Sequence, residues 1–259
     1  MDTSRDILIF CGQSNMQGYT ESCPVENAVI GGHEYRYLTN TIVPLSHPVG
    51  EDIGESKLLM ASHEGKGSLI PDFCRAYIEK THREVLAVHA ACAGTHIAEW
   101  LPPAERYDAL IRKAQGALSK LAERSGRVYF IWLQGESDAI RGVSEDEYIH
   151  ALEELRGHLY RDLPLDGFGI IRVGKFVEDE RDLAILRAQE AACRSGDFLM
   201  LTRVTAVCTQ APSLINPYAP GHYSNAGMTL IGQFAGANLG RHAIGEPLVT
   251  DPEAYTELM

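Results

Sequence analysis

Five short apolar runs divide this chain, and each is apolar on successive residues instead of alternating with polar ones. This pattern is typical of parallel strands that helices cover on both faces of a sheet. The expected strands span residues 6–12, 84–94, 127–135, 167–173 and 197–204. Few folds other than a layered α/β structure satisfy five such runs spread over one chain.

Helical patterns lie between and after these runs. Apolar residues recur at helical spacing in segments 68–82, 107–126, 144–160, 180–196 and 224–242. Ser144 and Glu147 form a capping box, Ser224 is expected to cap the last helix, and Gly126 is expected to end the second. The alternation of strands and helices predicts a three-layer α/β/α sandwich with a flavodoxin-like, five-stranded parallel sheet. For this sheet we assume the flavodoxin-like strand order 2-1-3-4-5.

The domain organisation follows from the same pattern. Neither a repeat nor a linker rich in Pro, Gly or Ser interrupts the chain, so residues 1–259 are expected to form a single domain. The stretch 19–67 has little periodicity and is predicted to be an excursion over the edge of the sheet, of a length that is usually functional or mobile.

Composition excludes several classes of function. The formal net charge of -12, without a block rich in Lys and Arg, argues against nucleic-acid binding. The sequence shows neither a secretory signal nor a run long enough to span a membrane, which predicts a cytoplasmic protein without a membrane partner. Six scattered cysteines without a CxxC pair are read as reduced thiols.

Polar residues and glycines follow the first three expected strands. In a sheet of order 2-1-3-4-5, strand one lies between strands two and three, so Ser14 is expected between Gly94 and Gln134. A hydroxyl there suits acyl transfer. The backbone N–H groups of Ser14 and Gly94 and the side-chain amide of Gln134 would form the oxyanion hole. Ser14 could instead be only a helix N-cap, but three polar strand exits together favour a nucleophile.

A serine hydroxyl needs a base to remove its proton. We predict that His222 is this base, because it follows the fifth expected strand and the segment 205–221 is long enough to return it to strand one. The alternative is a histidine that only packs against the last helix.

Five segments, in this order, resemble the sialate O-acetylesterase and acetylxylan esterase branch of the SGNH hydrolases. They are "GQSNMQG", "CAGTHIAEW", "WLQGESDA", "LRAQEAA" and "GHYSNAGMTLIG". The resemblance covers residues 7 to about 240. It implies that Ser14 is the nucleophile, that His222 is the base, and that Gly94 and Gln134 are oxyanion donors. It also implies deacetylation of carbohydrate esters without a metal or organic cofactor.

The chain departs from this family at one position. Many SGNH hydrolases place an aspartate three residues before the histidine, where this sequence has Ala219. Glu136 of "QGE" is the first candidate to orient the imidazole, a backbone carbonyl of the 216–221 turn is the second, and Asp138 is the third. Glu136 could equally be a buried carboxylate that braces the Ser14 loop.

Four further residues are expected to contact substrate because they lie at the same strand exits: Gln13, Asn15, Thr95 and Trp100. Trp100 either stacks on a sugar face or lies at the edge of the core. His89 and His96 do not have the spacing of a metal site, so none is expected. The sequence thus predicts a serine esterase for acetylated xylan or O-acetylated sialic acid. The alternative is a catalytically silent sugar-binding relative.

Overall fold

A mixed sheet of seven strands forms the centre of the molecule. The computed structural model describes residues 5–51, 66–121, 126–177 and 179–250. The strands are β1 (Arg5–Gly12), β2 (Gly32–Arg36), β3 (Thr41–Pro44), β4 (Glu84–His89), β5 (Val128–Leu133), β6 (Gly167–Ile171) and β7 (Leu199–Thr202). Their order is β3-β2-β4-β1-β5-β6-β7, and only the β2–β3 pair is antiparallel.

The five predicted strands are present in the predicted order, as β4-β1-β5-β6-β7. The expectation of five strands in total is wrong, because the 19–67 stretch contributes β2 and β3 to one edge of the sheet. β2 was not predicted because it has no continuous apolar run: it contains Glu34, a charged residue that is buried in the structure. Its carboxylate accepts a hydrogen bond of 2.7 Å from the N–H of Gly50.

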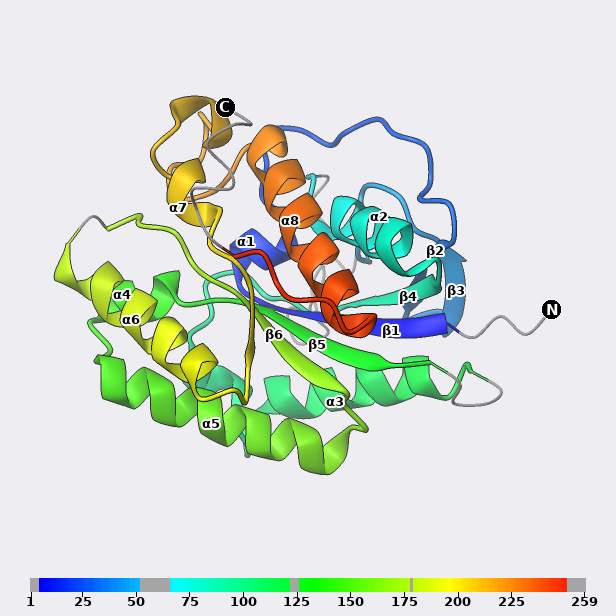
Figure 1. The fold of residues 1–259 in the computed structure, drawn as a ribbon, viewed down its shortest axis with the longest axis horizontal. Helices are drawn as coiled ribbons and strands as arrows, with labels where there is room; N and C mark the ends of the chain where they lie inside the picture. The colour runs from blue at the N-terminus through cyan, green and yellow to red at the C-terminus, as the bar shows by residue number, and fades with distance from the viewer. Residues whose placement is uncertain (1–4, 52–65, 122–125, 178, 251–259) are drawn as a thin grey trace.

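Helices cover both faces of the sheet, which confirms the three-layer architecture (Figure 1). One face carries α1 (Ser14–Gln17), α2 (Ile70–Thr81), α7 (Thr205–Cys208) and α8 (Asn225–Ala243). The other carries α3 (Glu105–Leu118), α5 (Glu145–Asp162) and α6 (Glu180–Arg194), with the short α4 (Glu136–Arg141) at the end where the strands finish. Two short 3-10 helices are η2 (Ile97–Trp100) and η3 (Pro212–Leu214).

The helix starts follow the predicted capping signals. Ser144 and Glu147 form the capping box of α5, and the Ser224 side chain accepts a hydrogen bond from the N–H of Gly227 at the start of α8. The predicted end of α3 is wrong. The helix stops at Leu118, so Gly126 is not its cap. The residues from 122 to 125 lie outside the described part of the chain.

The central strands have no exposed face. Ile7, Leu8, Ile9 and Phe10 of β1 are all fully buried, as the uninterrupted apolar run predicts when helices pack on both sides. The polar residues that follow the strands are therefore gathered at one edge of the core, beside the carboxyl ends of β1, β4 and β5. In the described part of the chain, no helix combines the length and apolarity needed to cross a membrane.

Candidate active site

The turn after β1 starts at a glycine whose backbone lies against β5. Gly12 has a positive φ of 144°, and a Cβ atom there would lie 2.0 Å from the carbonyl oxygen of Leu133. A side chain is excluded, so the apolar strand has to end in glycine. The N–H of Gln13 then bonds to the same Leu133 oxygen over 3.2 Å, and Ser14 becomes the first residue of α1.

Ser14 does not cap this helix. The N-cap position is occupied by Gln13, and no side chain caps α1. The Ser14 hydroxyl instead lies 2.9 Å from Nε2 of His222, which is 208 positions away in the sequence. The structure thus brings together the predicted nucleophile and the predicted base.

A compact loop between η3 and α8 carries His222. The N–H of His222 bonds to the carbonyl of Ala219 over 3.1 Å, and the carbonyl of His222 accepts from the N–H of Asn216 over 2.8 Å. The Asn216 side chain also donates to the carbonyl of Tyr19 over 2.7 Å, which ties the loop to the segment after α1. The loop is held at both sides of the histidine.

The imidazole has a defined tautomer. Its Nδ1 lies 3.3 Å from the carbonyl oxygen of Ala219, which can only accept, so the proton is on Nδ1 and the lone pair of Nε2 faces Ser14. The ring of Tyr19 packs against the imidazole with centroids 4.8 Å apart. Burial lowers the pKa of His222, against an opposing effect of the Ala219 and Pro220 backbone. This geometry corresponds to the second candidate of the sequence analysis, a backbone carbonyl of the 216–221 turn.

Glu136 does not contact His222. Its Oε1 accepts a 2.7 Å hydrogen bond from Nδ2 of Asn15, and its Oε2 is buried without a partner among the described residues. Burial, with smaller effects of Asp182 and Asp138, raises the pKa of the Glu136 carboxyl above its usual range. The expectation that Glu136 orients the imidazole is therefore corrected, and its bonding is that of a brace.

Asn15 links this brace to the histidine loop. Its Nδ2 also donates to the carbonyl of Gly221 over 3.2 Å, and its Oδ1 accepts from the N–H of Tyr223 over 3.4 Å. Both residues that flank His222 are thus bonded to the residue that follows Ser14. Asn15 is fully buried, which corrects the expectation that it contacts substrate.

Gln134 is also fully buried, and its amide is already satisfied. Its Nε2 donates to Oε1 of Gln13 over 3.2 Å, to the carbonyl of Thr95 over 3.0 Å and to the carboxylate of Asp138. Its Oε1 accepts from the hydroxyl of Tyr148 over 3.0 Å. An amide nitrogen has two protons, so three acceptors leave none for a substrate. The expectation that Gln134 serves the oxyanion hole is corrected.

The 92–96 turn carries another predicted oxyanion donor, Gly94. Residues before it are bonded to the Ser14 turn, since the N–H of Cys92 donates to the Gly12 carbonyl over 2.9 Å and that of Ala93 donates to Oε1 of Gln17 over 2.7 Å. Gly94 is exposed, with a φ of 72°. Its N–H and that of Ser14 make no hydrogen bond in the described part of the chain. These two predicted donors are available to a ligand.

Trp100 and Thr95 support this turn from inside. Nε1 of Trp100 donates to Oγ1 of Thr95 over 3.1 Å, and Oγ1 donates to the carbonyl of Cys92 over 2.8 Å. Trp100 is fully buried and packs edge to face on Trp132. The expectation of a sugar-stacking tryptophan is wrong, and Thr95, 1% exposed, presents no surface to a substrate.

Sequence reasoning missed two contributors. Tyr19 packs on the imidazole, although its segment has no periodicity that would place it there. Gln189, within the quoted "LRAQEAA", donates from Nε2 to the carbonyl of Gln134 over 2.8 Å and accepts from the N–H of Val173. Its place in a motif was the only available signal.

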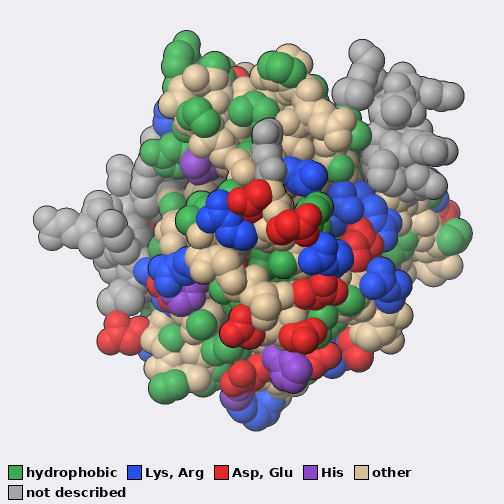
Figure 2. All heavy atoms as spheres, turned by 90° about the vertical axis from the view of Figure 1, so that its left-hand side faces the viewer, with side chains coloured by type: hydrophobic (Ala, Val, Ile, Leu, Met, Phe, Trp, Pro, Cys, Tyr) green, Lys and Arg blue, Asp and Glu red, His purple; other side chains and the backbone are tan. Residues whose placement is uncertain are grey.

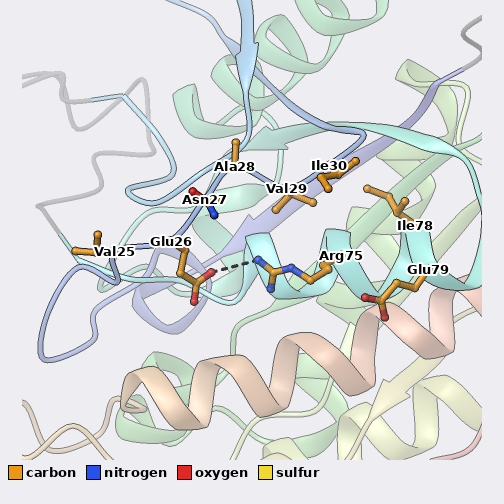
Figure 3. Close-up of a pocket in the computed structure, with 9 residues that line it drawn as sticks. All are labelled: Val25, Glu26, Asn27, Ala28, Val29, Ile30, Arg75, Ile78 and Glu79. Carbon is orange, nitrogen blue, oxygen red and sulfur yellow. Dashed lines mark hydrogen bonds and ion pairs between the residues drawn. The ribbon is translucent and has the colours of Figure 1, made fainter.

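A view of the surface and a close-up of a pocket complete the description. Figure 2 faces the side where the strands end. Acidic and basic side chains are interspersed over the middle and lower part of this view, whereas hydrophobic and uncharged polar groups dominate its upper part. A pocket of about 820 Å³ lies between the 25–30 segment and α2, where Glu26 pairs with Arg75 at 3.2 Å (Figure 3). None of the residues lining it belongs to the site at Ser14. Among the described residues, no group of three His, Cys, Asp or Glu side chains could hold a metal ion.

The fold matches solved structures over nearly its whole length. A protein from Arabidopsis thaliana has a TM-score of 0.68 at 16% identity, with 92% of this chain and 98% of that chain covered. NanS has a TM-score of 0.64 at 16% identity, covering 93% and 98%. A carbohydrate acetylesterase from Xanthomonas citri has a TM-score of 0.55 at 15% identity, covering 94% and 58%. At these identities the likeness establishes a shared fold.

The sequence model of one family, described as carbohydrate esterase, sialic acid-specific acetylesterase, matches residues 4–237. This match makes the protein a carboxylic ester hydrolase of the SGNH type. The chain belongs to that family, and hydrolysis of acetyl esters on carbohydrates is the activity of its class. No curated protein matches the chain in sequence.

Proposed function

We propose that this protein removes acetyl groups from carbohydrates by a serine mechanism, with Ser14 as nucleophile and His222 as general base. The observation that carries the proposal is the 2.9 Å contact between Oγ of Ser14 and Nε2 of His222. Two unbonded N–H groups, those of Ser14 and Gly94, support it, because donors beside a nucleophile are what an acyl-transfer intermediate requires.

In the first half-reaction, Nε2 of His222 takes the hydroxyl proton as Oγ of Ser14 attacks the acetyl carbonyl carbon. The N–H groups of Ser14 and Gly94 donate to the oxygen that becomes negative. Nε2 then gives its proton to the sugar oxygen, the ester bond breaks, and acetyl-Ser14 remains. In the second half-reaction a water attacks with the same base, and acetate and free Ser14 are released.

The carbonyl of Ala219 has a defined part in this scheme. It accepts from Nδ1 over 3.3 Å and so keeps the lone pair of Nε2 aimed at Ser14. It carries no full charge, so it stabilises the imidazolium less than a carboxylate would. We therefore propose a slower enzyme than one with a complete triad.

The test uses p-nitrophenyl acetate, then O-acetylated sialic acid and acetylated xylooligosaccharides. Ser14→Ala is expected to reduce kcat by at least about 10³-fold, as loss of a catalytic serine does. Ser144→Ala is the matched control, because it removes another serine hydroxyl at the start of a helix, the cap of α5. It costs about 1 kcal/mol of stability and leaves kcat unchanged.

A second reading, a catalytically silent sugar-binding relative, is favoured by the missing carboxylate at Ala219. A wild-type protein that binds acetylated sugars but releases no acetate would establish it and overturn the esterase. Release of acetate from the sialic acid ester and not from xylooligosaccharides would assign the substrate that the family description names.

A further inference from the structure

Besides that of Gln17, three side-chain amides lie at the Ser14 turn, those of Gln13, Asn15 and Gln134, and the last two are fully engaged. Asn15 and Gln134 are completely buried. The Asn15 amide donates to Glu136 and Gly221. The Gln134 amide donates to Gln13, Thr95 and Asp138. Neither can reach a reacting carbonyl. The third belongs to Gln13, which directly precedes Ser14.

The amide of Gln13 has a fixed orientation. Its Oε1 accepts from Nε2 of Gln134 over 3.2 Å, from the N–H of Ser137 over 3.1 Å and from the N–H of Gly135 over 3.4 Å. Three donors on the oxygen determine where the nitrogen points, since both atoms lie in one rigid plane.

The Nε2 of Gln13 has no hydrogen-bond partner among the described residues, yet it is not among the polar atoms sealed from solvent. Gln13 as a whole is only 4% exposed. The protein satisfies the oxygen of this amide, whereas its two N–H groups are unused and open to solvent, so they can donate to a ligand.

The surroundings indicate which ligand atom this is. Nε2 of Gln134 bonds both to Oε1 of Gln13 and to the carbonyl of Thr95, so the Gln13 amide lies beside the turn that carries Gly94. Ser14 follows it in the chain. The unused N–H groups of Gln13 and Gly94 therefore belong to segments that Gln134 joins, and that of Ser14 belongs to the nucleophile itself.

Resting on the proposed esterase function, we infer that Nε2 of Gln13 donates the third hydrogen bond to the oxyanion of the tetrahedral intermediate. Gln13 takes the place that the sequence analysis gave to Gln134. Gln134 is then a positioning residue, which holds the Gln13 amide through Oε1. Each oxyanion donor is worth about 10²- to 10³-fold in kcat.

The decisive variant is Gln13→Glu, because a carboxylate keeps an acceptor for Gln134, Gly135 and Ser137 and replaces the donor by a negative oxygen. With p-nitrophenyl acetate we expect kcat to fall by at least about 10²-fold while KM changes by less than about threefold. Gln115→Glu, on the exposed side of α3, is the matched control for the added charge and keeps wild-type kcat.

A boronic acid gives a readout that a structural role would not move. Ethylboronic acid forms a tetrahedral adduct with a serine hydroxyl and places an oxygen in the oxyanion hole. Its inhibition constant is expected to rise in Gln13→Glu by a factor similar to the fall in kcat, with the thermal midpoint close to that of the wild type. If Gln13→Glu is unfolded, Gln13→Met replaces it, since methionine is similar in size and has no donor.

The outcomes separate the two proposals. A wild-type protein inert on every ester overturns the esterase and this inference with it. An active wild type whose folded Gln13→Glu and Gln13→Met variants keep kcat within about threefold overturns the role of Gln13 alone. A parallel loss of kcat and boronate affinity at unchanged KM supports it.

Discussion

The side-chain nitrogen of Asn15 donates to the carbonyl oxygen of Gly221 over 3.2 Å, across 206 positions of sequence. Asn15 follows the proposed nucleophile and Gly221 precedes the proposed base. This hydrogen bond, with the one from the N–H of Tyr223 to Asn15, fixes the spacing of Ser14 and His222. Alignment of the two reacting side chains is therefore built into their neighbours in the chain.

The first prediction concerns Glu136, which holds Asn15 from the other side. Because burial raises the pKa of this carboxyl, an amide is a close substitute for it. We expect Glu136→Gln to lower kcat by about tenfold or less, the effect of one altered hydrogen bond. Glu136→Ala, which leaves the Asn15 amide without its acceptor, should cost about 1–3 kcal/mol of stability. A loss near 10⁴-fold in Glu136→Gln would instead identify a triad acid.

The same carboxyl predicts a pH effect on stability. A raised pKa means that the folded state binds more protons than the unfolded state above the ordinary glutamate pKa, so the free energy of unfolding falls as pH rises through that window. Glu136→Gln removes this contribution. Urea titrations at pH 5 and pH 8 should show that the free energy of unfolding of the variant, relative to that of the wild type, is higher at pH 8 than at pH 5. A difference independent of pH would contradict the raised pKa of this buried carboxyl.

His222 sets the pH dependence of activity. The base acts only when neutral, and burial lowers its pKa, so kcat/KM should rise with pH and level off with an inflection below the ordinary histidine value of 6.5. Ala219→Asp should place a carboxylate near Nδ1, move the inflection to higher pH and raise kcat at pH 8 by about tenfold, a charged hydrogen bond being worth about 1.5–3 kcal/mol. Ala219→Asn is the uncharged control, whose inflection should stay in place.

Tyr19 is predicted to shield the imidazole of His222 from water. Its ring packs 4.8 Å from that of His222, so Tyr19→Ala should expose the base, move the kcat/KM inflection toward 6.5 and lower kcat about two- to tenfold, the worth of one aromatic pair. Tyr19→Phe keeps the ring and should behave as wild type. Equal losses in both variants would point to the hydroxyl and refute a packing role.

Substitution of Gln134 is predicted to reduce the stability of the fold more directly than the chemical step. Gln134→Met leaves the carbonyl of Thr95 and the carboxylate of Asp138 each short of a donor inside the core, whereas the hydroxyl of Tyr148 keeps its bond to the backbone carbonyl of residue 134. A cost of about 3 kcal/mol follows, which lowers the melting temperature by roughly 10 °C in a domain of this size. Calorimetry measures it. An unchanged melting temperature with a kcat reduced more than about 10²-fold would return Gln134 to the oxyanion hole and displace Gln13.

Much of the fold was readable locally. Strands buried on both faces appear as continuous apolar runs, so the five parallel strands and the polar exits at Ser14 and Gln134 followed from the sequence pattern. Their order was assumed from the flavodoxin-like winding, and the sheet has that order. β2 was not predicted because it contains the charged residue Glu34. Burial of this carboxylate is compensated by hydrogen bonds to groups elsewhere in the chain, including the N–H of Gly50. A charged residue that is satisfied only by the tertiary structure looks exposed in a sequence.

The sequence by itself determined which residues lie at the carboxyl ends of the strands, because strand ends and helix starts set their positions. These residues are Ser14, Gly94, Gln134, Glu136 and His222. The tertiary structure decided what each of them can do there. Whether an amide has a spare N–H, or a carboxylate reaches an imidazole, depends on bonds such as that from Gln134 to Gln13, 121 positions away. The periodicity of apolar residues indicates which side chains of one segment are buried. The hydrogen bonds of a polar side chain, however, are made to partners in other segments. The chemistry of the site is therefore determined only when these segments pack together.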